Sequence, residues 1–354
     1  IVDPKIGETV YDPAAGTAGF LVAAYNHIRL ANSSPAGTQQ VEVDGKPQTR
    51  GLGDRLPAAQ LSVLQNRTFF GNDVDPKMVR LATMNLTLRG LPNVRILLRN
   101  VLTTTLDAER KAELELPEGG FDLVLANPPF SGRVDKDRIV DDVKVGRATA
   151  TELLFLKYMM DSLRPGGRCG VIVPEGVLFG STGAHRELRR QLIENNRVEA
   201  VLSLPGGVFQ PYSGVKTSVL FFRKGGATEN VLFLHADNDG YKLDANHDTP
   251  IDADDLPGLV AAYRSRDERL AEWQAVFPPL PRPTPPAWPH NWWFADAATL
   301  RANDFNLSAG RYRPMSQAKV DHRDPRELLD ELAAIEAEIA EEVEALRVAL
   351  SEAA

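Results

Sequence analysis

The stretch FDLVLANPPF, residues 121–130, begins as a buried strand and ends abruptly. A short apolar run is typical of a strand that is buried on both faces of a parallel sheet. Asn127 and two consecutive prolines then end the strand, because proline cannot donate a hydrogen bond to a strand ladder. We infer that this strand displays Asn127 and the residues after it at its carboxyl end.

The composition is that of a globular protein without a broadly basic surface. The 354 residues are 43% hydrophobic, and 48 acidic against 40 basic side chains give a formal net charge of -8. Such a surface cannot bind nucleic acid nonspecifically as a whole. The single cysteine, Cys169, excludes an internal disulfide, and no apolar run is long enough to span a membrane. We expect a soluble cytoplasmic protein, and the start at Ile1 leads us to expect a piece of a longer product.

Strand-like and helix-like segments alternate from residue 7 to 224, which predicts an α/β fold with a doubly wound, mostly parallel sheet. The expected strands are 8–12, 67–73, 94–98, 121–126, 170–174, 198–204 and 217–222, and the expected helices are 20–30, 76–88, 151–163 and 184–193. Ligands of such sheets bind beyond the carboxyl ends of the strands. Asp12, Asp73, Asn100 and Asn127 all fall at such ends.

Two polar insertions interrupt this alternation. Residues 33–56 are rich in turn residues, and residues 131–150 are charged and directly follow the displayed strand end. Long loops are usually functional or disordered. We therefore predict that 131–150 is a mobile loop on the substrate side.

The chain changes character at residue 277, where FPPLPRPTPPAWPH holds seven prolines in fourteen residues. We predict a catalytic domain over 1–276, a stiff proline-rich linker over 277–291, and a C-terminal extension over 292–354. Asp324, Pro325 and Glu327 indicate the start of a long helix with one apolar stripe. Such a helix favours assembly with a partner helix, although packing on its own domain stays open.

The stretch YDPAAGTAGF, residues 11–20, predicts a glycine-bearing turn from a strand into a helix. Gly16 and Gly19 allow close approach of a ligand to backbone N–H groups. The spacing is not that of a nicotinamide dinucleotide fingerprint. Asp73 has the chemistry to accept both hydroxyls of a ribose, while Asp75 fits the cap of the helix that begins at Pro76.

Asn127 and Pro128 offer two acceptors for the hydrogens of a ring amino group such as N6 of adenine. If these acceptors lie outside the ring plane, the nitrogen becomes tetrahedral and its lone pair becomes available for attack. The prolines fix the backbone, and Phe130 gives a flat face for stacking.

These motifs together resemble the modification (M) subunit of type I restriction-modification enzymes, which are N6-adenine DNA methyltransferases. The resemblance is carried by DPAAGTAGF, GNDVDPKMVRLATMNLTLRG, FDLVLANPPF, GGRCGVIVPEGVLFGSTGAHRELRRQL and SLPGGVFQPYSGVKTSVLFF. It covers residues 7–224 closely, and 239–244 and 303–314 more loosely. It implies the S-adenosylmethionine-dependent methyltransferase (Rossmann-like) fold with a C-terminal helical extension.

The resemblance also implies a site. Its expected cofactor-binding residues are Asp12, Pro13, Ala14, Gly16, Thr17, Gly19, Phe20, Asp73, Val74, Asn100 and Val101, and its expected catalytic residues are Asn127, Pro128, Pro129 and Phe130. The cofactor is S-adenosyl-L-methionine, and the adenine is flipped out of the duplex. No metal site is predicted, because the histidines lack ligand spacing.

The implied partners are double-stranded DNA, a specificity (S) subunit that binds two M subunits, and a restriction (R) subunit. Six cations form the expected DNA-contacting patch: Lys144, Arg147, Arg186, Arg189, Arg190 and Lys216. The chain departs from the family in having Asn100 where Asp is usual, and in lacking the Phe-x-Thr-Pro segment and the helical N-terminal domain. Methylation of a protein glutamine or an RNA amino group, and a catalytically idle scaffold, are the alternatives.

Overall fold

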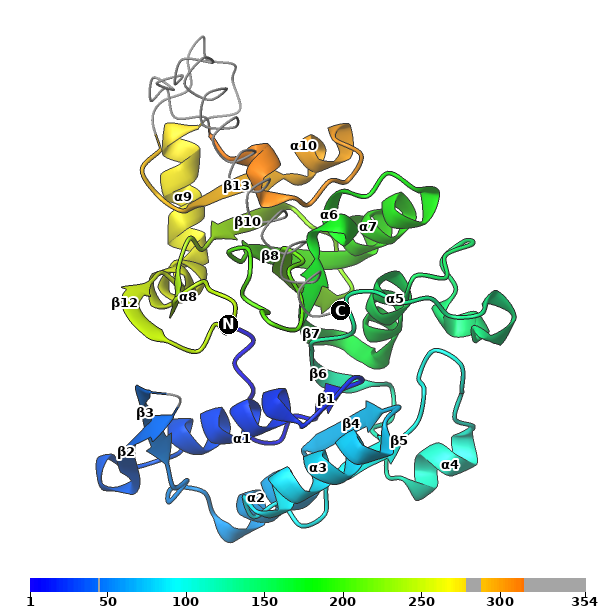
Figure 1. The fold of residues 1–354 in the computed structure, drawn as a ribbon, viewed down its shortest axis with the longest axis vertical. Coiled ribbons are helices and arrows are strands. Elements are labelled where there is room, and N and C mark those ends of the chain that lie inside the picture. The colour runs from blue at the N-terminus through cyan, green and yellow to red at the C-terminus, as the bar shows by residue number, and fades with distance from the viewer. Residues whose placement is uncertain (44, 278–287, 315–354) are drawn as a thin grey trace, which may run out of the picture. The chain divides into compact units, whose positions relative to one another are not determined.

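The computed structural model describes residues 1–43, 45–277 and 288–314, nearly all in one compact unit around a central sheet (Figure 1). The strands of this unit are β1 (Val10–Asp12), β2 (Thr38–Val43), β3 (Lys46–Gly51), β4 (Phe69–Asp73), β5 (Arg95–Leu98), β6 (Phe121–Ala126), β7 (Leu163–Pro174), β8 (Asn196–Ser203), β9 (Thr217–Lys224), β10 (Asn230–His235), β11 (Asp239–Tyr241), β12 (Pro250–Asp254) and β13 (Trp292–Asp296). The helices are α1 (Gly19–Ala31), α2 (Ala58–Asn66), α3 (Pro76–Thr87), α4 (Ala108–Glu113), α5 (Thr151–Ser162), α6 (Glu175–Phe179), α7 (Gly183–Asn195), α8 (Leu256–Arg264), α9 (Arg266–Val276) and α10 (Ala297–Ala302).

The central sheet has the strand order β13-β10-β8-β9-β7-β6-β1-β4-β5. The pairs from β7 through β6, β1 and β4 to β5 are all parallel. The strand β9 is antiparallel to both of its neighbours, and β13 is antiparallel to β10. The predicted mostly parallel, doubly wound α/β fold is therefore confirmed.

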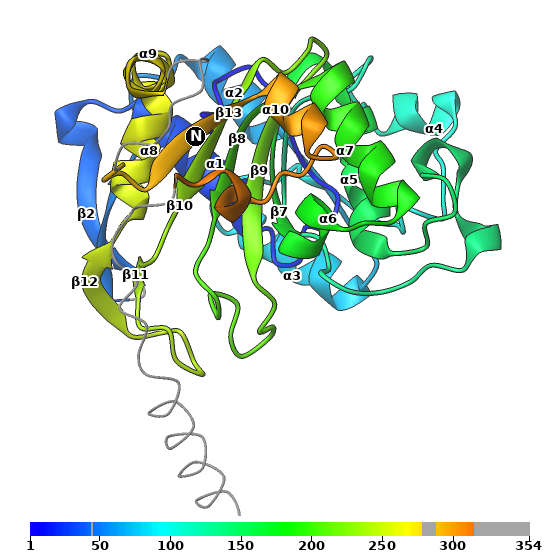
Figure 2. The ribbon, with the colours of Figure 1, turned by 90° about the horizontal axis from the view of Figure 1, so that it is seen from above.

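Side chains of β6 alternate between the two faces of the sheet, as expected for a strand that is covered on both sides. Leu123 and Leu125 belong to one buried cluster, which also contains apolar residues of α1, α2 and α3. Val124 and Ala126 belong to the other cluster, with residues of α5 and α7. Figure 2 shows α5 and α7 together on one side of the sheet. The apolar run in FDLVLA thus supplies both cores.

The chain leaves the middle of the sheet in both directions, and this places the site. From β1 it proceeds to β4 and β5, and from β6 it proceeds to β7 on the other side. The strands β1 and β6 are neighbours. In open α/β sheets a ligand binds beyond the carboxyl ends of the strands at such a switch point.

The two insertions are more ordered than the sequence led us to expect. Residues 38–43 and 46–51 pair as the antiparallel strands β2 and β3. In the segment 131–150, Ile139, Val143 and Val145 are buried in the core that contains α5. The segment is also closed at its base by a hydrogen bond from Val134 N to Thr149 O (2.9 Å). The expected mobile loop is instead a packed segment, because three of its apolar side chains reach the core.

The chain returns to the sheet after the proline-rich stretch. Trp292–Asp296 pairs with β10, and residues 289–313 belong to the same compact unit as the residues before the stretch. The extension expected from residue 292 therefore begins, in the structure, as a strand of the central sheet. Residues 278–287 and the predicted helix after Asp324 lie outside the described residues. In the described ranges, none of the helices has the length and apolarity that a membrane span requires.

Candidate active site

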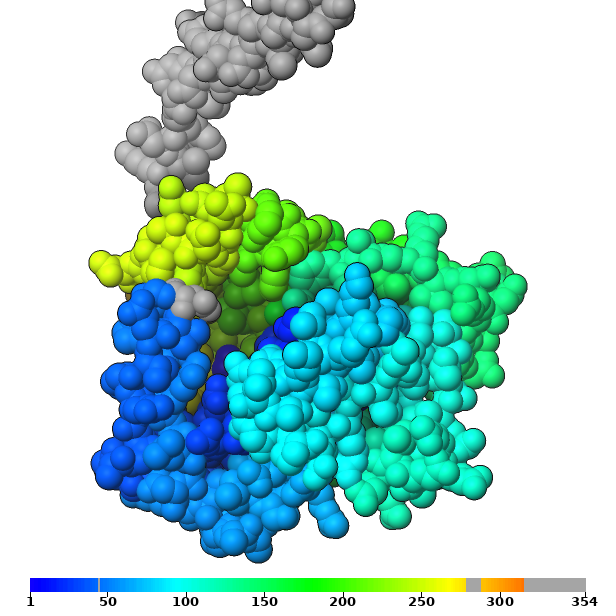
Figure 3. Space-filling view, turned by 60° about the horizontal axis from the view of Figure 1, so that its bottom comes forward, coloured from blue at the N-terminus to red at the C-terminus, as the bar shows by residue number. Residues whose placement is uncertain are grey.

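The chemically interesting side chains gather along one edge of the sheet. Asp12 ends β1, Asp73 ends β4, and Asn127 directly follows β6, while Asn100 lies two residues after β5. Since neighbouring strands are about 5 Å apart, these four positions span roughly 15 Å. Figure 3 shows a hollow in this region, with the dark-blue N-terminal segment at its bottom, between the blue β2–β3 segment and the cyan α3 and β5 segment.

Two backbone N–H groups of the turn after β1 form hydrogen bonds to residues of β4. Ala15 N donates to Asn72 O (2.9 Å), and Gly16 N donates to Asp73 Oδ2 (2.9 Å). Gly71 makes this close approach possible, because a Cβ there would lie 2.8 Å from Ile96 Cδ1 and 3.1 Å from Ala15 Cβ. Gly16 has a φ of +52°, a conformation that favours glycine.

The turn leaves space and unused donors next to the two carboxylates. A Cβ built on Gly16 or on Gly19 would meet no atom within 4 Å. The helix α1 has no side-chain cap and no acidic residue in its first turn, so its first N–H groups are available. Thr17 and Gly19 are exposed, Pro13 is buried and Ala14 is half-buried. Phe20 packs against the core beneath α1, which indicates a structural contribution.

Asp12 is almost completely buried, with 2% of its surface exposed. Its Oδ1 accepts a hydrogen bond from Ala14 N (3.0 Å). Burial raises the pKa of Asp12 to about 7, the nearby charge of Asp73 adds to this rise, and the N–H of Ala14 opposes it. The carboxyl groups of Asp12 and Asp73 lie near enough to affect each other's charge, and such a pair favours a positively charged ligand.

Asp73 has one hydrogen bond at each carboxylate oxygen, from Gly16 N (2.9 Å) and from Asp75 N (2.9 Å). Each oxygen keeps a further lone pair for a ligand hydroxyl. The structure confirms that Asp75 is the cap of α3, because its Oδ1 accepts from Lys77 N (2.7 Å). Val74, which follows Asp73, is 62% exposed and offers an apolar face at the strand end.

The side chains of Asn100 and Val101 are less available to a cofactor than the sequence led us to expect. Asn100 Oδ1 accepts from Leu102 N (3.0 Å), so the oxygen expected to hold the adenine of the cofactor already closes a local turn. The side chain of Val101 is 2% exposed and belongs to the core. Val101 therefore cannot offer its side chain to a ligand in this conformation, and only its backbone remains for that purpose.

The NPPF element is displayed as the sequence indicated. Asn127 and Pro129 are exposed, Pro128 is buried, and Phe130 is half-buried. In the part of the chain that the structure describes, no backbone N–H donates to the carbonyl of Pro128. The amide oxygen of Asn127 and this carbonyl are thus two acceptors at the carboxyl end of β6.

Phe209 is a site residue that the sequence analysis missed. It lies between β8 and β9, and its ring is 5.1 Å from the ring of Phe130, with an angle of 70° between the planes. The stretch SLPGGVFQPYSG carried part of the family resemblance, but nothing local showed which residue it would meet. The structure thus pairs Phe209 with the last residue of the NPPF element.

A row of hydrogen-bonded side chains, of which Tyr11 and Asn72 are buried and Arg99 and Tyr158 half-buried, lies just before the strand ends. Arg99 Nη2 donates to Tyr158 Oη (2.9 Å), Tyr158 Oη lies 2.9 Å from Tyr11 Oη, and Tyr11 Oη donates to Asn72 Oδ1 (2.6 Å). Burial raises the pKa of Tyr11 well above its usual value, so its phenol stays neutral. Tyr11, Asn72 and Arg99 directly precede Asp12, Asp73 and Asn100. These hydrogen bonds therefore couple the positions of the ends of β1, β4 and β5.

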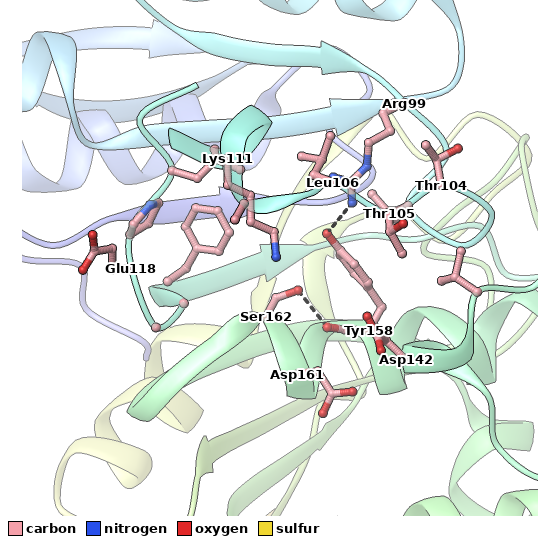
Figure 4. Close-up of a pocket in the computed structure, with 18 of the residues that line it drawn as sticks. Arg99, Thr104, Thr105, Leu106, Lys111, Glu118, Asp142, Tyr158, Asp161 and Ser162 are labelled. Atoms are coloured by element: carbon pink, nitrogen blue, oxygen red, sulfur yellow. Dashed lines mark hydrogen bonds between the residues drawn. The ribbon is translucent and has the colours of Figure 1, made fainter. Parts of the chain in front are cut away.

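Arg99 and Tyr158 also line a pocket of about 860 Å³ between α4 and α5 (Figure 4). Phe121 and Gly120 contribute to the same pocket at the start of β6. Asn127 follows the other end of this six-residue strand, about 20 Å away. The pocket is therefore distant from Asn127, although Arg99 and Val101, which flank Asn100 after β5, also line it.

One of the six cations of the expected DNA-contacting patch is buried, and three others form ion pairs. Arg189 is only 2% exposed, and its guanidinium donates to backbone carbonyls, so it cannot contact DNA. Arg190 is bonded to Glu187 and Glu194, Lys144 to Asp141, and Lys216 lies 3.5 Å from Glu175. Arg147 and Arg186 are exposed. The sequence cluster RELRRQ suggested a basic face, whereas the fold turns its central arginine inward.

Comparison with known proteins identifies the family. The model of the family described as N-6 DNA methylase matches residues 1–321, and the chain therefore belongs to this family. It is 31% identical to the type I restriction enzyme EcoEI methylase subunit of Escherichia coli over 246 residues, which cover 68% of this chain and 43% of that protein. It is 29% identical to the EcoKI methylase subunit of Escherichia coli strain K12 over 329 residues, which cover 90% of this chain and 55% of that protein.

A solved structure of the type I R-M system, described by its complex assembly and conformational transition, has a similar fold. The TM-score is 0.62 with 29% sequence identity, over 99% of this chain and 63% of that chain. The chain spans about half the length of the curated relatives named above.

Proposed function

We propose that the full-length protein transfers a methyl group from S-adenosyl-L-methionine to N6 of a flipped adenine in double-stranded DNA. The observation that carries this proposal is the position of Asn127 and Pro128 after β6, beside Asp12 on β1, at the switch point of the sheet. The family and the type I relatives support it. The protein acts as the modification subunit of a type I restriction-modification complex.

The strand-end residues fit this cofactor. In this proposal Asp12 receives the ammonium group of its methionine portion, and Asp73, with a free lone pair on each carboxylate oxygen, receives its ribose hydroxyls. The open space at Gly16 and Gly19 allows the backbone of the turn to approach it, and Val74 offers an apolar surface to its adenine ring. When bound, the cofactor supplies an electrophilic methyl group on a sulfonium.

Asn127 and Pro128 act on the target base. The amide oxygen of Asn127 and the carbonyl of Pro128 accept the two hydrogens of the adenine amino group, which draws its nitrogen toward tetrahedral geometry. Phe130 and Phe209 hold the ring of the base by stacking. These groups orient the nitrogen for a direct displacement, and the proton that it loses passes to water.

The chain needs partners to read a DNA sequence. Its net charge is -8, and Arg190, Lys144 and Lys216 of the expected patch are engaged by acidic side chains. We propose that a specificity subunit reads the sequence and joins two modification subunits, with a restriction subunit beside them. The C-terminal residues beyond 314, with their predicted amphipathic helix, are the segment we assign to this assembly.

The reaction is tested by mass spectrometry of nucleosides from cells that express the full-length gene with its neighbouring specificity gene. N6-methyladenine is expected only when both genes are present. If both proteins are soluble and bind cofactor but no N6-methyladenine forms, the DNA reaction is wrong, and a protein glutamine or RNA amino group becomes the substrate.

The pKa of Asp12 predicts how cofactor binding depends on pH. Below pH 7 the Asp12 carboxyl of the free protein is protonated, and a ligand ammonium requires the carboxylate, so binding releases a proton. Affinity is expected to increase about tenfold from pH 6 to pH 8 and to level off above pH 7. Calorimetric titration in buffers of different ionisation enthalpy measures both the affinity and the proton release.

The variant Asp12→Asn is the control for this prediction. It is expected to bind cofactor weakly and without pH dependence. Because the pKa of Asp12 is higher in the folded than in the unfolded state, protonation of this carboxyl stabilises the folded state. This stabilisation is complete below pH 3.8 and is lost as the pH rises through about 7. Asp12→Asn should therefore unfold at a higher temperature than the wild type at pH 8. A wild-type affinity that does not change with pH would contradict the assignment.

Removing the hydroxyl of Tyr158 is expected to loosen the strand ends. Tyr158→Phe leaves Arg99 without its acceptor and Tyr11 without one partner. We expect a loss of about 1–3 kcal/mol in the free energy of unfolding and weaker cofactor binding. Urea denaturation and calorimetric titration measure the two effects. Tyr25→Phe, which removes a phenol from the opposite face of the sheet, should leave cofactor affinity unchanged.

A further inference from the structure

The connection between β8 and β9, residues 204–216, projects beyond the sheet on the side of the candidate site (Figure 2). We call it the β8–β9 loop. Its base is fixed, because Leu204 N donates to Thr217 O (3.1 Å) and both Leu204 and Pro205 are buried. The loop is therefore held at its root and presents its tip to solvent.

Phe209 attaches the tip of this loop to the catalytic element. Its ring contacts the ring of Phe130, at 5.1 Å between centroids. Ser213 N donates to Phe209 O (2.8 Å), which closes a tight turn over residues 209–213 that contains the cis peptide bond Gln210–Pro211. Tyr212 belongs to the same turn, three residues after the ring that faces Phe130.

Tyr212 is 94% exposed, more than any other large apolar side chain of the described residues. Single exposed apolar side chains are common, and exposure alone would mean little. Here the tyrosine shares a tight turn with Phe209, whose ring contacts Phe130, on a loop that is held at its root. A tyrosine also loses little conformational entropy when it stacks, because it has only two side-chain torsions.

We propose that Tyr212 enters the base stack at the position that the target adenine vacates. This inference rests on the proposed function. A flipped base leaves a flat gap between its former neighbours, and proteins that distort duplexes fill such gaps with inserted side chains. Phe130 and Phe209 hold the extruded base, while Tyr212 keeps it from returning. Tyr212 is therefore a positioning residue that acts through the DNA.

The experiment uses the full-length subunit with its specificity subunit, on duplexes that contain the recognition site located by sequencing methylated DNA. One duplex has thymine opposite the target adenine, and the other has an abasic site there, which lowers the cost of extrusion. Tyr212→Ala is expected to slow single-turnover methylation of the first duplex about 10- to 100-fold. On the second duplex its rate should return close to that of the wild type.

Two further variants complete the design. Tyr212→Phe keeps the ring and should act like the wild type on both duplexes. Leu88→Ala removes another strongly exposed apolar side chain, 83% exposed on α3's C-terminal cap, and should also act like the wild type. Fluorescence of 2-aminopurine at the target position reports extrusion directly and should decrease in Tyr212→Ala.

The outcomes separate this inference from the proposed function. If the wild type methylates adenine and Tyr212→Ala is equally fast on the matched duplex, Tyr212 has no part in extrusion and only this inference is overturned. It is also overturned if Tyr212→Ala is equally slow on both duplexes. If the wild type methylates no adenine on either duplex, both the proposed function and this inference, which rests on it, are wrong.

Discussion

Asn127→Ala is expected to reduce methylation of DNA about 100- to 1000-fold while the protein stays folded and binds its cofactor. The amide oxygen of Asn127 is one of two acceptors that draw the adenine nitrogen toward tetrahedral geometry, an interaction that strengthens as the methyl group is transferred. Removal of a single group of this kind typically has such an effect. Asn127 is exposed after β6, so its replacement creates no cavity.

Single-turnover methylation of a duplex, with calorimetric titration of the cofactor in parallel, measures this effect. Asn127→Asp keeps acceptor oxygens and should retain more activity than Asn127→Ala. Asn93→Ala, at an exposed asparagine before β5, should have no effect on either measurement. Near-normal methylation by Asn127→Ala would remove Asn127 from the reaction, and a parallel loss of cofactor binding would assign it to the cofactor.

Arg189→Ala is expected to lower the free energy of unfolding by about 3–5 kcal/mol, the largest effect on stability that we predict. The guanidinium of Arg189 donates to the carbonyls of Phe305 (3.0 Å), Val177 (3.1 Å), Gly180 (2.9 Å) and Asp304 (3.3 Å). Its removal leaves buried carbonyls without donors and opens a cavity. It also detaches the residues after α10 from α6 and α7.

Urea denaturation monitored by circular dichroism measures this effect. Arg190→Ala is a matched control on the same helix, because Arg190 makes only surface ion pairs, and little change in stability is expected from it. The exposed Arg186 tests DNA contact separately, by the salt dependence of binding. If Arg189→Ala unfolds like the wild type but binds DNA more weakly, Arg189 faces DNA and the buried position is wrong.

The secondary structure and the displayed NPPF element could be predicted because their causes are local. Short apolar runs gave the strands from β1 to β9 that were predicted, and Asp75 with Pro76 gave the start of α3, which the structure bears out. Two prolines after Asn127 end β6 whatever the rest of the chain does. The alternation of strands and helices was sufficient to predict the doubly wound sheet.

The remaining parts of the candidate site depend on residues that are distant in sequence. Nothing near Phe209 shows that its ring meets Phe130, and nothing in helix α5 shows that Tyr158 joins Tyr11 and Arg99. The path of the chain after β5 decides two further features. It lets Leu102 N bond the side-chain oxygen of Asn100, and it buries Val101 in the core. The pattern of RELRRQ is equally compatible with a solvated face and with a buried arginine.

The sequence by itself determined seven of the strands, β1 and β4 to β9, four of the helices, α1, α3, α5 and α7, the mostly parallel sheet, and the edge at which Asp12, Asp73 and Asn127 stand. These follow from rules of period, proline geometry and capping that act within a few residues. Only the tertiary structure decided that β13 returns to the sheet, that Arg189 is buried, that the segment 131–150 is packed, and that Phe209 joins Phe130. Those features depend on packing between distant segments, where many partners fit the local pattern and the close-packed interior selects one.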